Sequence, residues 1–257
     1  MEALRQVDTW PCDHVAVALT GAREAEHGDV ERPFAWASVT KLATAVAVLV
    51  GVEEGIVELD EPAGPPGSTL RHLLAHASGL APDEPTPLAP PGRRRIYSNA
   101  GFEAAAALVA CRAELSFAAY FEHVWGFPLA GSPASGVEAT LAELVTVARE
   151  LLEPRRLSRA LLAEACSVQF PGLDGVLPGF GRMAPNDWGL GFELRDAKRP
   201  HWTGARNSPA TFGHFGRSGT FLWVDPEREL ALACLTDLAF GDWAKDAWPR
   251  LADSVVV

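Results

Sequence analysis

The sequence predicts an α/β fold in which strands from both ends of the chain form a sheet around a helical insert. β-Rich segments occur near both ends of the 257-residue chain, whereas the middle is rich in helix-forming residues. The hydrophobic content of 48% is enough for one sizeable core or two closely joined lobes. There is no internal repeat, so the order of strand, helices, strands and helix indicates one assembled sheet.

The N-terminal part predicts two strands followed by a helix. Residues His14–Thr20 are β-rich and stop at a glycine, and a polar stretch leads to a second short strand at Arg32–Trp36. From Ser38 the chain is dense in Ala, Leu and Val and closes with Gly55, a plausible C-terminal cap. This helix is apolar nearly all round, so we expect it to be buried centrally.

The middle of the chain predicts several helices. A short helix at Leu70–His76 is followed by a rigid, extended connection with prolines at 82, 85, 87, 90 and 91. Further helices are expected at Ala100–Leu115, Phe117–His123 and Leu141–Leu152.

Strand signals return in the last third. They cover Trp188–Leu194, Thr211–His214, Gly219–Val224 and Glu229–Leu235. A closing helix is expected at Trp243–Asp253.

Charge and composition disfavour nucleic acid and membrane partners. The net charge of −11 would repel a phosphate backbone, and the basic run at residues 93–95 is interpreted as a solvated loop. The longest apolar run, Leu42–Val52, has 11 residues and is too short to span a bilayer. The N-terminus shows no export signal, so we expect a cytoplasmic protein.

The four cysteines, Cys12, Cys111, Cys166 and Cys234, are far apart and form no C-x-x-C pair. We expect them to be reduced and mostly buried, with no metal site and no cofactor. His72 and His76 have the spacing of a metal-binding helix but lack the Glu of H-E-x-x-H, which favours a structural role. There is no G-x-S-x-G elbow and no phosphate-binding loop.

The first chemical motif is Ser38-Val39-Thr40-Lys41 at the start of the predicted helix. The spacing places a hydroxyl and an amine on one helix face. A serine needs a base to take its proton, and a lysine with a lowered pKa can act as that base. The motif alone is weak, because about 0.14 matches are expected by chance.

Two further motifs follow in order. Tyr97-Ser98-Asn99 has a chance expectation of only about 0.02. Tyr97 is a candidate general acid or base beside a lysine, and the Asn99 amide could hold a substrate carbonyl or Lys41. His214-Phe215-Gly216 lies on or beside a predicted strand, where backbone N–H groups could stabilise an oxyanion.

With these motifs in order, the chain resembles the serine β-lactamase and penicillin-binding protein superfamily, in its class C β-lactamase, DD-peptidase and esterase branch. The segments Ala37–Lys41 and Leu70–Leu80, and Pro91-Gly92 ahead of Tyr97, are similar to family segments. The resemblance runs from about residue 14 to the C-terminus. It implies an antiparallel sheet flanked by helices, with residues 1–60 and 170–257 forming the sheet part and 61–169 a helical subdomain in one compact unit.

The resemblance also implies roles for site residues. Ser38 would be the acylated nucleophile, Lys41 its proton partner and Tyr97 the general acid or base. The backbone N–H groups of Ser38 and Arg217 would form the oxyanion hole. The residues implied in substrate binding are Asn99, His214, Phe215 and Gly216.

The chain departs from the family pattern at Phe215, where relatives commonly have Thr. The Thr hydroxyl helps to hold a substrate carboxylate, so its loss puts carboxylate recognition in doubt, although the Arg217 side chain could replace it. Trp36, Trp188, Phe192, Phe212 and Phe215 lie near the motifs and form either a partly aromatic acyl pocket or, for most of them, part of the core.

Together these observations predict a serine hydrolase acting on a small ester or amide through an acyl-Ser38 intermediate. Two alternatives stay open: an acyltransferase using the same site, and a non-catalytic ligand-binding protein on the same scaffold. The identity of the substrate and the oligomeric state are outside what the sequence decides.

Overall fold

The computed structural model describes residues 2–256, which divide into two units. The sheet unit comprises Met1–Val39, Glu138–Arg155 and Leu194–Val257. The helical unit comprises Thr40–Val137 and Arg156–Glu193. The helix after Ser38 belongs to the helical unit, and the helix at 141–152 belongs to the sheet unit. The boundaries between the units therefore differ from the residue ranges expected from the sequence.

The main sheet has six strands in the order β2-β1-β10-β9-β8-β7. The strands are β1 (Val15–Gly21), β2 (Ala25–Gly28), β7 (Glu193–Leu194), β8 (Phe212–Phe215), β9 (Phe221–Asp225) and β10 (Leu230–Thr236). β1 pairs antiparallel with both β2 and β10, and β9 pairs antiparallel with both β10 and β8. The pairing of an N-terminal strand with C-terminal strands confirms that both chain ends build the sheet.

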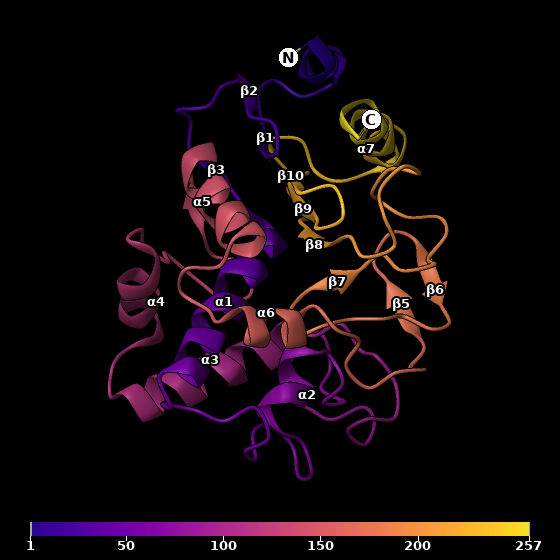
Figure 1. Cartoon of the computed structure of the whole chain (residues 1–257). Coiled ribbons are helices and arrows are strands. Elements are labelled where there is room, and N and C mark those ends of the chain that lie inside the picture. Colours follow the sequence, from indigo (N-terminus) through magenta and orange to yellow (C-terminus); the bar gives the residue numbers. More distant parts are fainter. Residues whose placement is uncertain (1, 257) are drawn as a thin grey trace. The chain divides into compact units, whose positions relative to one another are not determined.

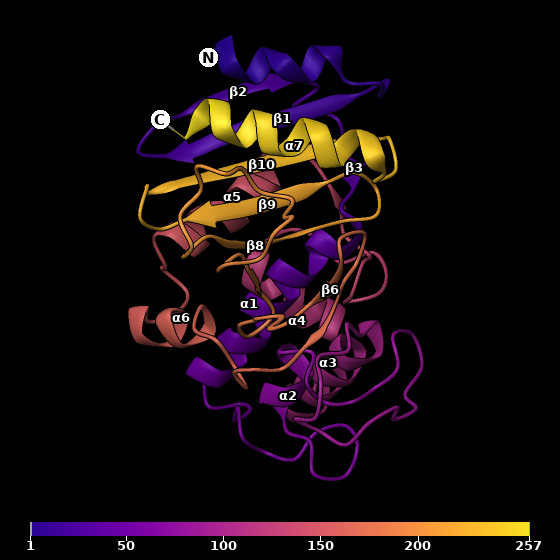
Figure 2. The same ribbon diagram turned by 90° about the vertical axis from the view of Figure 1, so that its right-hand side faces the viewer.

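Helices cover both faces of this sheet. α5 (Leu141–Leu152) packs against β10, β1 and β9. On the opposite face lies α7 (Asp242–Val255), as Figure 1 and Figure 2 show. The centre of its Trp248 ring lies 4.9 Å from that of Phe221 on β9. Every residue of β9 and β10 is buried because the sheet is covered on both sides. The short helix η1 (Glu2–Thr9) contacts α7 and β2.

Two strand expectations differ from the structure in detail. The strand expected at 32–36 is only β3 (Phe34–Ala35), which pairs with β4 (Glu138–Ala139) in a separate small sheet, whereas the partner of β1 on that side is β2, in the stretch described as polar. In the segment expected to form a strand at 188–194, only Glu193 and Leu194 do so. The N–H of Gly189 donates to the Phe192 carbonyl at 2.8 Å, so the chain turns tightly here instead of extending.

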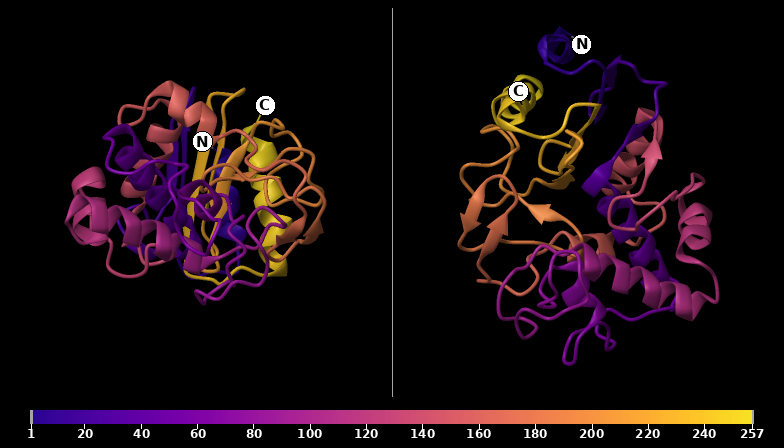
Figure 3. Two further views of the ribbon diagram at one scale, coloured as in Figure 1. Left: turned by 90° about the horizontal axis from the view of Figure 1, so that it is seen from below. Right: turned by 180° about the vertical axis from the view of Figure 1, so that it is seen from behind.

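The helical unit is organised around the helix α1 (Thr40–Glu53), whose residues 40–51 are all buried. α1 packs against α3 (Asn99–Ala113) and α4 (Phe117–Trp125), as the two views of Figure 3 allow the reader to follow. The unit also contains α2 (Leu70–Leu74), α6 (Arg159–Ala165), β5 (Gly175–Leu177) and β6 (Gly181–Met183).

The apolar character of α1, noted in the sequence, reflects this central position. A Cβ on Gly191, which has φ +88°, would lie 2.3 Å from the Ala45 Cβ, so only glycine permits the approach of that loop to α1. Within residues 2–256 no single helix has the length and composition needed to cross a membrane; α3 and α4 meet that test only as a pair bent by 86°.

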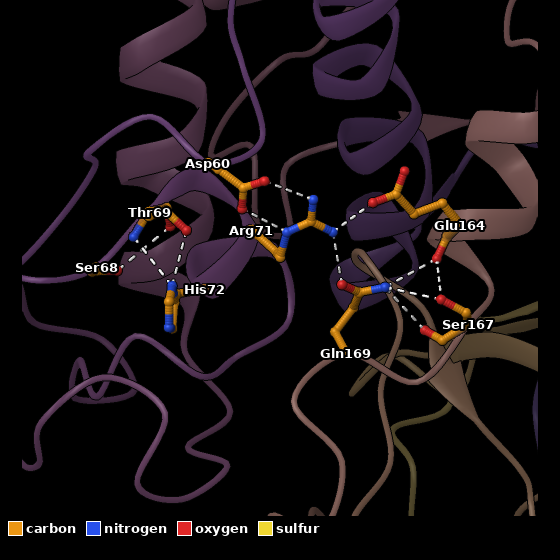
Figure 4. A network of polar contacts seen from close by, with 8 residues as sticks. All are labelled: Asp60, Ser68, Thr69, Arg71, His72, Glu164, Ser167 and Gln169. Atoms are coloured by element: carbon orange, nitrogen blue, oxygen red, sulfur yellow. Dashed lines mark hydrogen bonds and ion pairs between the residues drawn. The ribbon is translucent and has the colours of Figure 1, made fainter.

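Arg71 of α2 joins three segments of the helical unit, as Figure 4 shows. Its guanidinium donates to Asp60 at 2.8 Å, to Glu164 at 2.7 Å and to Gln169 at 2.9 Å. The hydrogen bond from Arg71 lowers the pKa of Asp60. The neighbouring His72 accepts from the Thr69 N–H at 3.3 Å and thereby caps α2, so its role here is structural.

Arg95 corrects the expectation that residues 93–95 form a solvated loop. Arg93 and Arg94 are exposed, but Arg95 is only 3% exposed. Its guanidinium donates to the carbonyls of Ala75 at 2.5 Å, Gln169 at 2.8 Å and Asn186 at 3.0 Å. Arg95 therefore satisfies backbone acceptors of three segments within the helical unit.

The cysteines are free thiols, as expected, but their burial differs from the expectation. Cys234 is buried, Cys12 and Cys166 are half-buried, and Cys111 is exposed.

Replacing Arg95 by Met should lower the midpoint of thermal unfolding by about 6–12 °C. The substitution removes the donor from several buried backbone carbonyls, and each carbonyl left without a partner costs about 1–3 kcal/mol of stability. Differential scanning calorimetry measures this shift. The matched control is Arg94→Met, which changes an exposed neighbour and should move the midpoint by less than about 2 °C. Equal midpoints for the two variants would contradict the role given to Arg95.

Candidate active site

The candidate residues divide between the two units. Ser38 and residues 214–217 belong to the sheet unit, whereas Lys41, Tyr97 and Asn99 belong to the helical unit. The sheet unit therefore carries the expected nucleophile and oxyanion hole, and the helical unit carries the expected proton-transfer groups.

Ser38 lies in the single turn η2 (Ala37–Val39), directly before α1, and is half-buried. Ala37 has φ 47°, a left-handed conformation that is unusual for a residue with a Cβ. The preceding Trp36 is fully buried, and its indole N–H donates to the Ala139 carbonyl at 3.2 Å.

The end of β8 approaches the Ser38 segment closely. A Cβ added to Gly216 would lie 2.5 Å from the Trp36 carbonyl oxygen and 3.1 Å from the Ala37 Cβ, so a larger residue could not fit here. The Thr220 hydroxyl donates to the same Trp36 carbonyl at 2.8 Å, and the Ser218 hydroxyl donates to the Ala35 carbonyl at 2.6 Å. These contacts bring together the backbone at Ser38 and the backbone at Gly216. The next residue after Gly216 is Arg217, which is exposed.

His214 and Phe215 are neighbours on β8 and differ in their surroundings. The Nδ1 of His214 lies 2.7 Å from the Phe215 carbonyl, which can only accept, so Nδ1 carries the proton. Phe215 is buried, and its ring lies 5.0 Å from Phe240 and 5.9 Å from Trp248 of α7. The Phe215 ring thus belongs to the core of the sheet unit, and only its backbone is left for the expected substrate contact.

Lys41 lies in the first turn of α1 and is fully buried. Its Nζ donates to the Asn99 Oδ1 at 2.6 Å and to the Ala134 carbonyl at 2.8 Å. Burial lowers the pKa of Lys41 to about 7, although the charges of Asp83 and Glu103 oppose this shift. Near neutral pH a substantial fraction of Lys41 is therefore an uncharged amine that can accept a proton.

Tyr97 and Asn99 stand beside this amine. The Lys41 Nζ lies 4.8 Å from the centre of the Tyr97 ring, which also contacts His76 at 4.7 Å between ring centres. Of the two uses expected for the Asn99 amide, a contact with Lys41 is the one observed in the helical unit. Between them, Ser98 caps α3 by accepting from the Gly101 N–H at 3.0 Å.

Several groups that shape the Lys41 site were not expected from the sequence. Asp83 accepts from the Asn99 amide at 2.7 Å, and Ala134 supplies a backbone acceptor for Lys41. The Nδ1 of His76 accepts from the Ser98 N–H at 3.1 Å and so helps to hold the Tyr97–Asn99 segment. No motif marks Asp83 or Ala134, because they act through contacts far along the chain, and the sequence marked His76 only by its spacing from His72 and its place in the segment Leu70–Leu80.

The five aromatic residues near the motifs are all buried, with exposures of 8% or less for Trp36, Trp188, Phe192, Phe212 and Phe215. This agrees with the interpretation that most of them are core residues.

Comparison with known proteins places this chain in a family. The Beta-lactamase family matches residues 14–132 and, in a second overlapping match, residues 112–256. A β-lactamase from Mycobacterium bovis, known from its crystal structure, shares 52% identity with a TM-score of 0.96, covering 98% of this chain and 97% of that one. No curated protein sequence matches this chain significantly.

More distant solved structures share the fold. Simvastatin synthase from Aspergillus terreus, as the LovD9 mutant, has a TM-score of 0.80 at 16% identity over 99% of this chain and 97% of that chain. EstCE1, a hydrolase with promiscuous acyltransferase activity, has a TM-score of 0.79 at 15% identity over 99% of this chain and 96% of that chain. At such identities the likeness shows the fold alone. The family match and the M. bovis structure confirm the resemblance, and this chain belongs to the β-lactamase family.

Proposed function

We propose that this protein is a serine acyl-hydrolase that acts on a small ester or amide through a covalent intermediate on Ser38. The observation that carries the proposal is the buried Lys41, whose pKa of about 7 suits a base and which follows Ser38 by three residues. A lysine with only a surface role would have no reason to be fully buried on two fixed acceptors.

Acylation begins when neutral Lys41 takes the proton of the Ser38 hydroxyl. At the same time the Ser38 oxygen forms a bond to the substrate carbonyl carbon. The carbonyl π-electrons move to the oxygen, and the backbone N–H groups of Ser38 and Arg217 stabilise that oxyanion. Collapse of the tetrahedral intermediate breaks the bond to the alcohol or amine, and Tyr97 supplies the proton that this leaving group needs.

Deacylation reverses the roles of the groups. Tyr97 takes a proton from water as the water oxygen bonds to the acyl carbon, and the second tetrahedral intermediate releases Ser38. Lys41 returns its proton to the serine oxygen. One water is consumed and one acid and one alcohol or amine are released, so the enzyme ends in its starting protonation state.

The surroundings of Phe215 favour a substrate without a carboxylate. The position that carries a Thr hydroxyl in many relatives here carries a ring packed on Phe240 and Trp248. A hydrogen bond to a charged group contributes about 1.5–3 kcal/mol, so its loss weakens binding of a carboxylated substrate. We therefore place esters ahead of penicillins as substrates.

Acyl transfer to an amine or alcohol remains an alternative for the same intermediate. The fold-level neighbours include a protein described as a hydrolase with promiscuous acyltransferase activity. An added nucleophile would change the product ratio of a transferase without changing its acylation rate. A non-catalytic binding protein, in contrast, would form no adduct at all.

Substituting Ser38 by Ala should abolish covalent labelling by a fluorophosphonate and turnover of an activated short-chain ester, because the acylated oxygen is removed. Intact-mass spectrometry measures the adduct. Ser254→Ala, which removes a hydroxyl from α7, serves as the matched control and should label like the wild type. Absence of any adduct on folded wild-type protein would favour the non-catalytic alternative.

The acylation rate should rise with pH through an apparent pKa near 7 and fall at lower pH, because protonated Lys41 cannot accept the serine proton. The rate of fluorophosphonate labelling between pH 5.5 and 9 gives this profile. The chain has only three lysines, Lys41, Lys198 and Lys245, so ¹³Cε-lysine NMR can follow the same titration directly. A flat profile would argue against Lys41 as the base.

For the wild type, kcat/KM for a neutral activated ester should exceed that for a penicillin by about 10- to 100-fold, which corresponds to the missing hydrogen bond. Steady-state hydrolysis of both substrates under one buffer condition tests this. Equal or higher kcat/KM for the penicillin would show that another group, such as the Arg217 side chain, holds the carboxylate.

A further inference from the structure

The amide of Asn99 is engaged at both ends within the helical unit. Its Oδ1 accepts from the Lys41 Nζ at 2.6 Å, and its Nδ2 donates to Asp83 Oδ1 at 2.7 Å. An ionised carboxylate can only accept hydrogen bonds. The Asp83 carboxylate therefore selects the amide orientation in which the NH2 group faces Asp83 and the oxygen faces Lys41.

This orientation determines what the neutral Lys41 amine can do. An uncharged amine has two N–H bonds and one lone pair, and Asn99 Oδ1 and the Ala134 carbonyl are acceptors for both hydrogens. The lone pair then occupies the remaining direction and can take a proton. If the amide were turned over, its NH2 group would face Lys41 and would donate into that lone pair.

The loop that carries Asp83 is held in place by the backbone. The Ala81 N–H donates to the Thr86 carbonyl at 2.8 Å, and the Asn99 N–H donates to the Pro82 carbonyl at 2.6 Å. The Ser98 hydroxyl donates to the Ala81 carbonyl at 2.6 Å. Prolines at 82, 85 and 87 restrict the loop further. Asp83 is therefore presented to Asn99 in one arrangement although its side chain is exposed.

We propose that Asp83 is a positioning residue that keeps the Asn99 carbonyl oxygen toward Lys41 and so leaves the Lys41 lone pair available for the serine proton. The inference rests on the proposed function, since it assigns Asp83 a part in the same acylation step. It assigns no contact between Asp83 and the substrate.

Asp83 also contributes a charge, and this effect has to be separated from positioning. The charges acting on Lys41 are Asp83, from the loop before α3, and Glu103, from α3, and both raise the pKa of Lys41 against the effect of burial. Uncharged groups near the amine include the Asn99 and Ala134 oxygens and the rings of Tyr97 and Phe102. Removal of the Asp83 charge should therefore lower the pKa of Lys41 and move the acid limb of the profile to lower pH.

Two substitutions at Asp83 separate the effects. Asp83→Ala removes both the charge and the acceptor, whereas Asp83→Asn removes the charge but keeps an oxygen that can accept from Asn99 Nδ2. Glu84→Gln removes the charge of the exposed neighbouring acid and is the matched control. The readouts are the fluorophosphonate labelling rate of Ser38 from pH 5.5 to 9 and the ¹³Cε-lysine titration of Lys41.

The expected results differ between the variants. Asp83→Ala should lower the plateau rate above pH 8 about 10-fold, whereas Asp83→Asn should restore it to within about threefold of the wild type. Both should lower the titration midpoint of Lys41, and Glu84→Gln should change neither quantity by a comparable amount. A merely structural role for Asp83 would lower the plateau rate and the thermal midpoint together.

A wild-type plateau in Asp83→Ala, with the thermal midpoint unchanged, would overturn the inference. An equal loss of plateau in Asp83→Ala and Asp83→Asn would also overturn it, since charge alone would then explain the effect. Failure of the proposed function has a different signature, because Ser38→Ala would then label as the wild type does, or the wild type would not label. The lysine titration needs no activity and tests the effect of the Asp83 charge on Lys41 in either case.

Discussion

Burial of the Lys41 amine imposes the constraint around which the candidate proton-transfer groups of the helical unit are arranged. An amine removed from water has to find its acceptors in the protein, and an amide oxygen and a backbone carbonyl supply them here. Neither acceptor carries a full charge, so burial prevails and the pKa of Lys41 falls to about 7. Two direct carboxylate contacts would instead have kept the lysine charged.

The sheet unit meets a different requirement, which is the close approach of two backbone segments. Ser38 follows a left-handed alanine, and Gly216 leaves the space that the Trp36 carbonyl needs. Hydroxyl groups of Thr220 and Ser218 hold the segment before Ser38 against the β8–β9 turn. Such contacts position backbone N–H groups without a flexible side chain, which suits stabilisation of a developing charge.

Much of the fold was predictable because it depends on local pattern. The helix at 141–152 has the expected bounds, and the apolar run of α1 is buried as its composition indicated. The turn at 188–193 was missed because aromatic and apolar residues there resemble a strand, whereas backbone contacts to α2 and α6 bend it. Arg95 was expected to be solvated because it adjoins two other arginines. Adjacent residues can share a charge and still differ in burial, and Arg95 alone of the three is buried.

The sequence by itself indicated the family and most of the element order, and it singled out Ser38, Lys41, Tyr97 and Asn99 as candidate site residues, because these motifs depend on short spacings along the chain. Only the tertiary structure decided which groups surround them. The contacts of Asn99 with Lys41 and Asp83 span 58 and 16 residues, and the core position of the Phe215 ring depends on a helix that comes later in the chain. Proton affinity and side-chain orientation follow from such distant contacts, since burial and hydrogen bonding are properties of the folded chain.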